Sequence, residues 1–291
     1  DMKIDAKVQS ISKLKDYFFL VPDYQREYVW KPDDEVEQFL IDIENEYSPD
    51  AKEQRNYFLG SIIIANNDRC FDVVDGQQRL TTIMLSLCVF RDLLKKETLN
   101  SAQKNYLQII ENLLYNFDIE SGETRVRLEL QYEESHDYLT ALIQEQPYNG
   151  VRSPSIVRMQ DAYTKILRHF QLYAGIDELI DFAKYCLTKI ELVVIESQDL
   201  SSALKIFETI NQRGAGLNAM DLVKNLLFKA TKLLDSKFYI GVNTALNRFK
   251  NDFQYNFTGW NKSSVEARQK ILLELVFDTW RINDLRLDRV K

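Results

Sequence analysis

Residues 71–82 read FDVVDGQQRLTT and decide how the first part of the chain folds. Asp75 and Gly76, a pair typical of tight turns, join a strand-like run to an apolar helix. Residues 77–79 (Gln-Gln-Arg) then fall in the first helical turn, where unpaired backbone N–H groups and the positive end of the helix dipole attract anions. The stretch therefore predicts a strand–turn–helix unit with an anion site at its bend.

Two side chains of this stretch suit phosphate chemistry in particular. Arg79 can neutralise phosphate oxygens, and Asp75 can hold Mg²⁺ or orient a water molecule. Thr81 and Thr82 add hydroxyl groups close by. A purely structural interpretation, an Asp-Gly turn followed by a threonine-rich helix start, explains the same residues.

The segments on either side of the bend extend this unit. YFLGSIIIA (57–65) and RCFDVV (69–74) flank Asn66-Asn67-Asp68, which predicts an antiparallel hairpin. The helix after Gly76 repeats apolar residues at helical spacing, which predicts that one face enters a core: Leu80, Ile83, Met84, Leu87 and Phe90.

The rest of the chain is mostly helical in pattern. YFFLV (17–21) predicts a strand, and residues 32–47 predict a helix opened by Pro32. Further helices are expected at 101–117, 133–145, 155–171, 177–189, 200–211, 219–234 and in two stretches after 236. VRLEL (126–130) and IELVVIES (190–197) predict strands, the second buried and added to the first sheet.

These patterns predict the α+β class, with a small mixed sheet and helices followed by a mainly α-helical region. We expect a nucleotide-binding core at 1–100, a helical region with strands that return to the core at 101–235, and C-terminal helices at 236–291. The last helix pattern continues to the final residue, which suggests a chain truncated before a further domain.

Composition narrows the class of protein. With 291 residues and 45% hydrophobic content the chain can bury substantial cores, and no apolar run approaches the roughly 18 to 20 residues of a membrane helix. The net charge of −7 argues against a surface that coats nucleic acid. The chain has no C-x-x-C pair, and its three cysteines suit buried free thiols in a reducing cytoplasm: Cys70, Cys88 and Cys186. Neither of its two histidines, His136 and His169, has a neighbour at zinc-ligand spacing.

Two more polar clusters accompany the bend. In VPDYQREYVW (21–30), Arg26 can grip a phosphate or carboxylate while the aromatics stack on a base, or the whole segment can simply be a packed turn. FETINQRGAGLNAMDLVKN (207–225) reads as a helix–loop–helix corner whose helices meet between Asn211 and Asn218. Arg213 and Lys224 are less well explained by such a corner, and both can close over an anion.

Taken together, these three stretches in this order resemble the N-terminal domain of the GmrSD-type modification-dependent restriction enzymes, which have a ParB/sulfiredoxin-like core. The resemblance covers nearly the whole chain. It implies a nucleoside-triphosphate-binding and hydrolysing domain in bacterial defence against phage DNA, and Mg²⁺ is the cofactor expected from Asp75. The implied partners are the nucleotide, modified phage DNA and an HNH nuclease domain or subunit, and homo-oligomers stay open.

The residues of the three motifs and the resemblance together give the expected site. Asp75 and Arg79 are expected to be catalytic, with Asp75 as the metal ligand. The expected nucleotide-binding residues are Tyr24, Gln25, Arg26, Gly76, Gln77, Gln78, Thr81, Thr82, Asn211, Arg213 and Lys224. Tyr24, Gln25 and Arg26 match a family segment that serves either nucleotide or DNA.

One alternative function uses the same residues. A non-hydrolytic ParB-like reader of DNA or of a modified base would place them against the DNA backbone. A carboxylate beside phosphates is repulsive unless a metal lies between them, so Asp75 favours the nucleoside-triphosphate hydrolase. Neither histidine lies in an HNH-like setting, so we expect no DNA cleavage by this chain alone.

Overall fold

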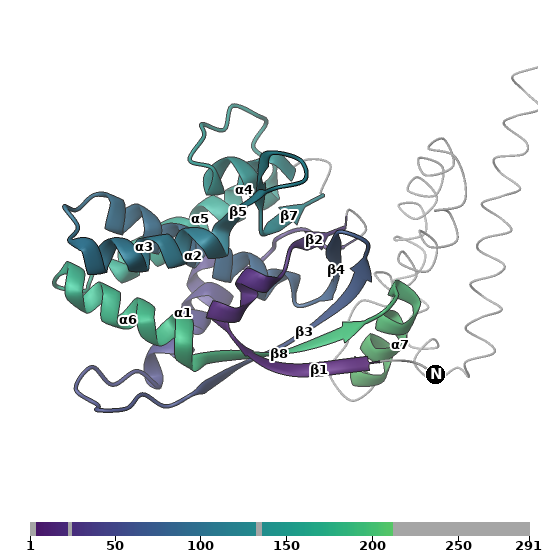
Figure 1. Cartoon of the computed structure of the whole chain (residues 1–291), viewed down its shortest axis with the longest axis horizontal. Helices are drawn as coiled ribbons and strands as arrows, with labels where there is room; N and C mark the ends of the chain where they lie inside the picture. Colours follow the sequence, from purple (N-terminus) through teal and green to yellow (C-terminus); the bar gives the residue numbers. More distant parts are fainter. Residues whose placement is uncertain (1–3, 23–24, 132–135, 212–291) are drawn as a thin grey trace, which may run out of the picture. The chain divides into compact units, whose positions relative to one another are not determined.

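The computed structural model describes residues 4–22, 25–131 and 136–211, which belong to one compact unit, residues 1–212 (Figure 1). The helices predicted at 219–234 and after 236, and the predicted domain 236–291, lie outside the described residues. The boundaries predicted near residues 100 and 235 stay predictions.

Two β-sheets form within this unit. The larger sheet has the strand order β1-β8-β3-β4-β2-β7, and a second sheet pairs β5 with β6. The strands are β1 (Ile4–Ser10), β2 (Phe19–Val21), β3 (Tyr57–Asn67), β4 (Cys70–Asp75), β5 (Tyr115–Asp118), β6 (Glu123–Val126), β7 (Leu128–Leu130) and β8 (Ile190–Ser197).

Both parallel and antiparallel pairs occur in the larger sheet. β3 and β4 form the predicted antiparallel hairpin, and β8 runs antiparallel to β1 and parallel to β3. β2 runs parallel to β4 and to β7. The buried strand predicted at 190–197 is confirmed and lies inside the first sheet, because its apolar residues need cover on both faces.

The helices begin where local signals place them. A capping box of Asn100 and Gln103 starts α3, and the Ser153 hydroxyl with Pro154 starts α5. The helical segments are η1 (Ile11–Asp16, 3₁₀), η2 (Pro32–Val36, π-helical), α1 (Glu37–Asn45), α2 (Gln77–Lys95), α3 (Ser101–Leu114), α4 (His136–Ile143), α5 (Pro154–Phe170), α6 (Ile176–Lys189) and α7 (Leu200–Asn211).

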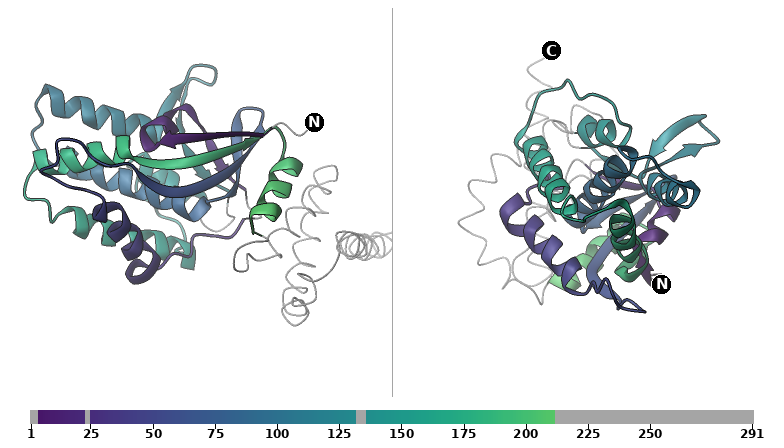
Figure 2. Two further views of the ribbon diagram at one scale, coloured as in Figure 1. Left: turned by 90° about the horizontal axis from the view of Figure 1, so that it is seen from below. Right: turned by 90° about the vertical axis from the view of Figure 1, so that its left-hand side faces the viewer.

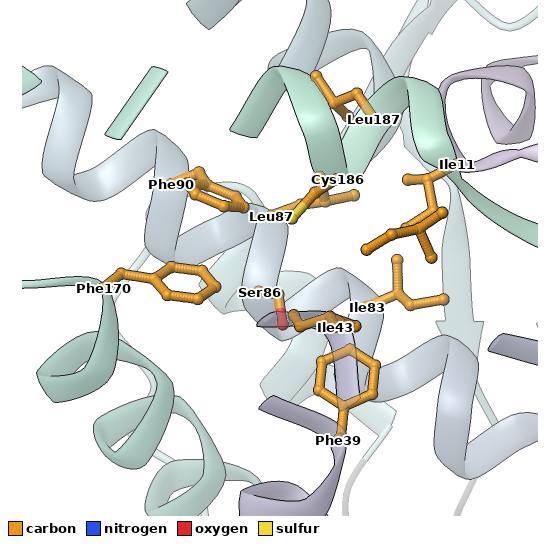
Figure 3. A pocket seen from close by; sticks show the side chains of 11 residues that line it. Ile11, Phe39, Ile43, Ile83, Ser86, Leu87, Phe90, Phe170, Cys186 and Leu187 are labelled. Atoms are coloured by element: carbon orange, nitrogen blue, oxygen red, sulfur yellow. The ribbon is translucent and has the colours of Figure 1, made fainter. Parts of the chain in front are cut away.

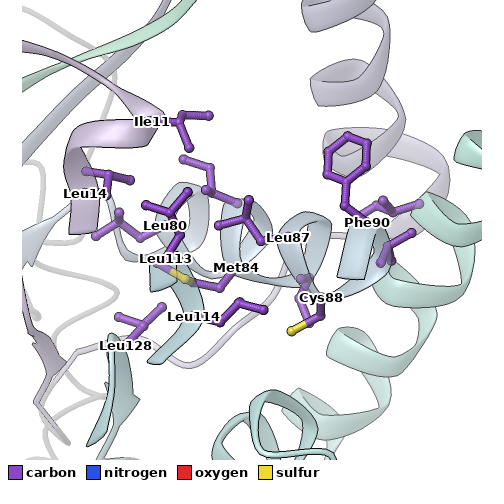
Figure 4. Close-up of a cluster of buried hydrophobic side chains, with 14 of the residues drawn as sticks. Ile11, Leu14, Leu80, Met84, Leu87, Cys88, Phe90, Leu113, Leu114 and Leu128 are labelled. Atoms are coloured by element: carbon purple, nitrogen blue, oxygen red, sulfur yellow. The ribbon is translucent and has the colours of Figure 1, made fainter. Parts of the chain in front are cut away.

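The main core surrounds α2 (Figure 4). This helix contacts α3, α5 and α6 and is buried on almost every side, whereas its sequence pattern predicted a single buried face. Leu85, Cys88 and Val89 are also buried, because neighbouring helices enclose the side of α2 that faces away from the sheet. α2 is therefore a central element, which fixes the position of its first residues.

α7 covers the opposite face of the sheet from α2. Ile62 and Ile64 of β3 belong to the main core, whereas the alternate residues Ile63 and Ala65 are buried outside it. Successive strand residues point to opposite faces, and α7 contacts β3, β4 and β8. Its buried residues Ala203, Leu204 and Phe207 therefore pack on the second face.

Three sequence predictions need correction. VRLEL is not one strand, because at Arg127 the chain changes partner: Val126 pairs with β5, whereas Leu128–Leu130 pairs with β2. The helix predicted at 101–117 ends at Leu114, where β5 begins. The sequence predictions include no strand at 4–10, yet β1 pairs there with β8 along the sheet edge.

The class prediction is confirmed: the described unit is a mixed α+β fold. All three cysteines are free thiols, with Cys88 and Cys186 buried and Cys70 half-buried. Among the described helices, none is both long and apolar enough to cross a membrane.

Candidate functional site

Strand topology brings two of the three sequence motifs together. β2 and β4 are parallel neighbours, so their carboxyl ends lie at the same edge of the sheet. The segment after β2 carries Gln25 and Arg26, and β4 is followed by Gly76 and α2. Parallel pairing of residues far apart in sequence thus brings the segment after β2 beside the start of α2.

The bend at Gly76 depends on glycine. Its φ is +91°, and a Cβ built there would lie 2.6 Å from Cγ2 of Ile62. Gly76 is the N-cap of α2, and no side chain among the described residues caps this helix. The first N–H groups of α2 are therefore available to an anion.

The Arg79 guanidinium lies flat against β3. Its Nη1 donates to the carbonyl oxygen of Ser61 at 2.9 Å. Gly60 makes this approach possible: its φ is +144°, and a Cβ there would lie 2.6 Å from Arg79 Cζ. The hydrogen bond to Ser61 uses one of the five N–H donors of the guanidinium group and holds this group in place. The other donors can serve a ligand.

Asp75 and Arg79 are an incompletely compensated pair of opposite charges. Burial raises the pKa of the Asp75 carboxyl, although the Gly76 N–H and the Arg79 charge act in the opposite direction. Burial likewise lowers the pKa of Arg79, against the attraction of Asp75 and Tyr57. Each charge is less stable than in water, so the site favours a ligand that brings further charges of both signs.

Asp75→Asn should make the protein more stable near neutral pH, by about 0.5–2 kcal/mol. Because the pKa of folded Asp75 is raised, its ionisation costs stability once the pH rises through that pKa. Asparagine avoids this cost and keeps an oxygen for the Gly76 N–H. Urea unfolding should therefore give a higher free energy of unfolding for Asp75→Asn than for the unmodified protein near pH 7, and equal values for the two proteins below about pH 4. The same difference at both pH values would contradict the explanation.

Gln78 joins the second motif in chain order (residues 71–82) to the first (residues 21–30). Its Oε1 accepts from the backbone N–H of Val29 at 2.9 Å, and its Nε2 donates to the carbonyl oxygen of Glu27 at 2.8 Å. The side chain is buried, with 7% of its surface exposed. Both ends of the amide are thus committed to the chain that follows Arg26.

Gln25 makes the reciprocal contact from the first motif to the second. Its Nε2 donates to the carbonyl oxygens of Val73 and Val74 at 3.2 and 3.0 Å, and its side chain is also buried. It therefore holds the last residues of β4. The two glutamines tie the segment after β2 to the strand end and helix start that carry Asp75 and Arg79.

The two threonines are turned into the protein. Thr81 and Thr82 donate their hydroxyl hydrogens to the carbonyl oxygens of Gln77 and Gln78, both at 2.8 Å. The Tyr28 hydroxyl lies 3.0 Å from Thr82 Oγ1 and must donate to it, since the Thr82 hydrogen is already used. Thr81 and Thr82 are 2% and 0% exposed, which places their hydroxyls in the packing of α2.

The other predicted site residues differ in their surroundings. Arg26 is exposed and Gln77 is half-buried. Asn211 is the last residue of α7, but its side chain is outside the described part of the structure. Tyr24, Arg213 and Lys224 also lie outside the described residues, so the nucleotide-binding assignments of all these residues stay predictions.

Sequence reasoning missed residues that support the site. Gly60 and Ser61 of β3 receive the Arg79 head group, and Tyr28 anchors the first motif. One signal was present: a glycine inside the strand pattern YFLGSIIIA indicates a bulge or a close approach. β3 does change register between Phe58 and Gly60.

Two other places in the described residues carry no comparable site. Within the described ranges, no group of three or more His, Cys, Asp or Glu is arranged to hold a metal ion, and His169 Nε2 lies 2.9 Å from Glu44 Oε1. An apolar pocket lies beside α2, lined by residues such as Phe39, Ile83 and Cys186 (Figure 3). Its Ser86 hydroxyl already donates to Thr82 O, so the pocket lacks a free polar anchor.

The fold and the site define an α+β domain that carries a charged site at the uncapped start of its central helix. A search of curated proteins returns no match. A family model described as "GmrSD restriction endonuclease, N-terminal domain" matches residues 8–228. The chain belongs to this family, as its three motifs predicted, and is a domain of a restriction system.

Proposed function

We propose that this domain binds and hydrolyses a nucleoside triphosphate at the bend between β4 and α2, and that hydrolysis licenses DNA cleavage by an HNH nuclease domain or subunit. The observation that carries the proposal is that Asp75 and Arg79, two half-buried opposite charges that attract each other, lie at an uncapped helix start. Phosphates would supply negative charge to Arg79 and to the helix N–H groups. A cation would supply positive charge to Asp75.

Mg²⁺ fits this arrangement. Protein sites often hold Mg²⁺ through one or two carboxylates, with water and substrate phosphates as the remaining ligands. Asp75 alone can serve as that carboxylate if the ion arrives with the nucleotide. The ion would neutralise charge on the phosphates, while Asp75 fixes its place beside Arg79.

The residues of the two motifs at 21–30 and 71–82 have separate roles in this proposal. Arg26 is exposed and can reach a phosphate, or the DNA that the restriction family implies as a partner. Gln25 and Gln78 act as positioning residues, because their amides are already bonded to the main chain. Gln77 is half-buried and remains a candidate for direct contact.

Arg79→Met should weaken nucleotide binding about ten- to a hundredfold, because it removes a charge-assisted contact of roughly 1.5 to 3 kcal/mol. Arg168→Met is the matched control, since Arg168 is exposed on α5. Calorimetry with each nucleoside triphosphate and Mg²⁺ measures the affinities, and phosphate release with and without modified DNA measures turnover.

The outcomes separate the two functions that the sequence suggested. A nucleotide hydrolase loses affinity only in Arg79→Met. Equal affinities in Arg79→Met and Arg168→Met would remove Arg79 from the site. If Arg79→Met instead weakens DNA binding in protein that hydrolyses no nucleotide, the DNA-reader function replaces this proposal.

A further inference from the structure

The first strand of the larger sheet has an open edge. β1 lies at the end of the strand order and pairs with β8 along its whole length (Figure 2, left-hand view). Within the described ranges, no strand pairs with its outer side. The backbone N–H and C=O groups that point outward from β1 can therefore accept a further strand.

The usual devices that protect an edge strand are weak in β1. Proteins block such edges with short strands, prolines, bulges or lone lysines. β1 has seven residues and no proline, and it pairs with β8 without a register shift. Residues 5–8 are all exposed, and Val8 has 62% of its surface in solvent. Lys7 is a lysine of the protective kind, but its charge is neutralised within the strand.

Asp5 is the residue that neutralises Lys7. The Lys7 Nζ lies 2.7 Å from Asp5 Oδ2, and both side chains are 55% exposed. Asp5 also lies opposite Glu196 of β8, on the same face of the sheet. Two carboxylates thus share one lysine, and a positive charge on the outer side of Asp5 would offset their repulsion.

A second copy of β1 supplies that charge. Consider two copies in antiparallel pairing, related by a two-fold axis that passes beside Ala6. Ala6 then lies opposite Ala6 of the second copy, and Asp5 of each copy lies opposite Lys7 of the other. Moving the axis to Lys7 or to Asp5 would set two lysines or two aspartates opposite each other. The strand is therefore complementary to itself in the register centred on Ala6.

We propose that β1 pairs with β1 of a second copy of this chain, antiparallel and centred on Ala6, so that the two larger sheets form one continuous sheet. The contact is formed by one strand from each copy and is small, so we expect a dissociation constant in the micromolar range. The site at Asp75 and Arg79 has no part in this pairing, and the proposal is independent of nucleotide hydrolysis.

Charge reversal tests the pairing in the full chain without nucleotide. Sedimentation equilibrium should show a dimer that weakens as salt rises. Asp5→Lys and Lys7→Asp should each weaken the dimer at least tenfold, because each sets like charges opposite each other. A mixture of the two variants should associate at least as tightly as the unmodified protein, because every opposite pair then has opposite charges. Glu120→Lys, in an exposed ion pair with Arg69, is the control that should leave the dimer unchanged.

Cross-linking tests the register. In a Cys70→Ser background the two remaining thiols are buried, so only an introduced cysteine is open to oxidation among the described residues. Ala6→Cys should then form a disulfide-linked dimer under mild oxidation, whereas Val8→Cys should not, since the two copies of position 8 lie four residues out of register. A monomer at the highest soluble concentration, a dimer that neither charge reversal weakens, no association in the mixture, or cross-linking through position 8 instead of position 6 would each overturn the proposal.

Discussion

Asp75→Asn should lower the rate of nucleotide hydrolysis about a hundredfold or more, the scale of a lost general base or metal-orienting carboxylate. Asparagine has nearly the same shape and can still accept from the Gly76 N–H. It lacks the charge that would hold Mg²⁺ or orient water beside Arg79. The loss should therefore fall on turnover and on the Mg²⁺ requirement, while the fold persists and becomes more stable.

Phosphate release at saturating nucleoside triphosphate, across a Mg²⁺ titration, measures this effect. Asp181→Asn is the control, because Asp181 is an exposed aspartate on α6. A gain in stability together with a loss of turnover would mean that the charge of Asp75 serves function at the expense of the fold. Normal turnover in Asp75→Asn would leave Asp75 with only a turn-forming role.

The bend at Gly76 and the helix after it were predictable because their signals are local. An Asp-Gly pair lies between a β-like run and a stretch in which apolar residues recur about every 3.6 residues. This local pattern specifies both elements without reference to the rest of the chain. The 190–197 strand was predictable for a similar reason, since LVVI is short, β-branched and without polar interruption. These features depend on neighbours within a few residues.

The roles of the two glutamines were not predictable in this way. Gln78 and Gln25 find their partners only because β2 pairs with β4, where Phe19 lies opposite Phe71. Both side chains were expected to bind nucleotide. In the structure both amides are buried and bonded to the main chain, because buried amides must satisfy their hydrogen bonds within the protein.

Edge elements were also difficult to predict. Residues 4–10 alternate apolar and polar side chains, which is a strand pattern, yet Ala6 and Val8 are exposed in β1. β1 is held by backbone pairing with β8 and contributes little to the core. In the β5–β6 hairpin, Phe117 is 59% exposed although Tyr115 and Val126, on the same face, pack against the core.

Gly60→Ala should reduce nucleotide affinity as much as Arg79→Met does, although Gly60 offers a ligand no side chain. Its φ of +144° is strained for alanine, and the new Cβ would lie 2.6 Å from Arg79 Cζ and 2.8 Å from Nη2. The guanidinium must leave its place against β3, and its bond to Ser61 breaks. We also expect a loss of about 1–3 kcal/mol in the free energy of unfolding from the backbone strain.

A double-mutant cycle separates displacement of Arg79 from general damage. If Gly60→Ala acts by moving the guanidinium, it should change affinity hardly at all in the Arg79→Met background, because the group it displaces is already gone. Gly175→Ala is the matched control, since a Cβ there meets no atom within 4 Å and its backbone is extended. Nucleotide affinity and urea unfolding are measured for all four proteins of the cycle. If Gly60→Ala weakens binding equally in both backgrounds, the strand has a role of its own at the site, and Arg79 does not depend on Gly60 for its position.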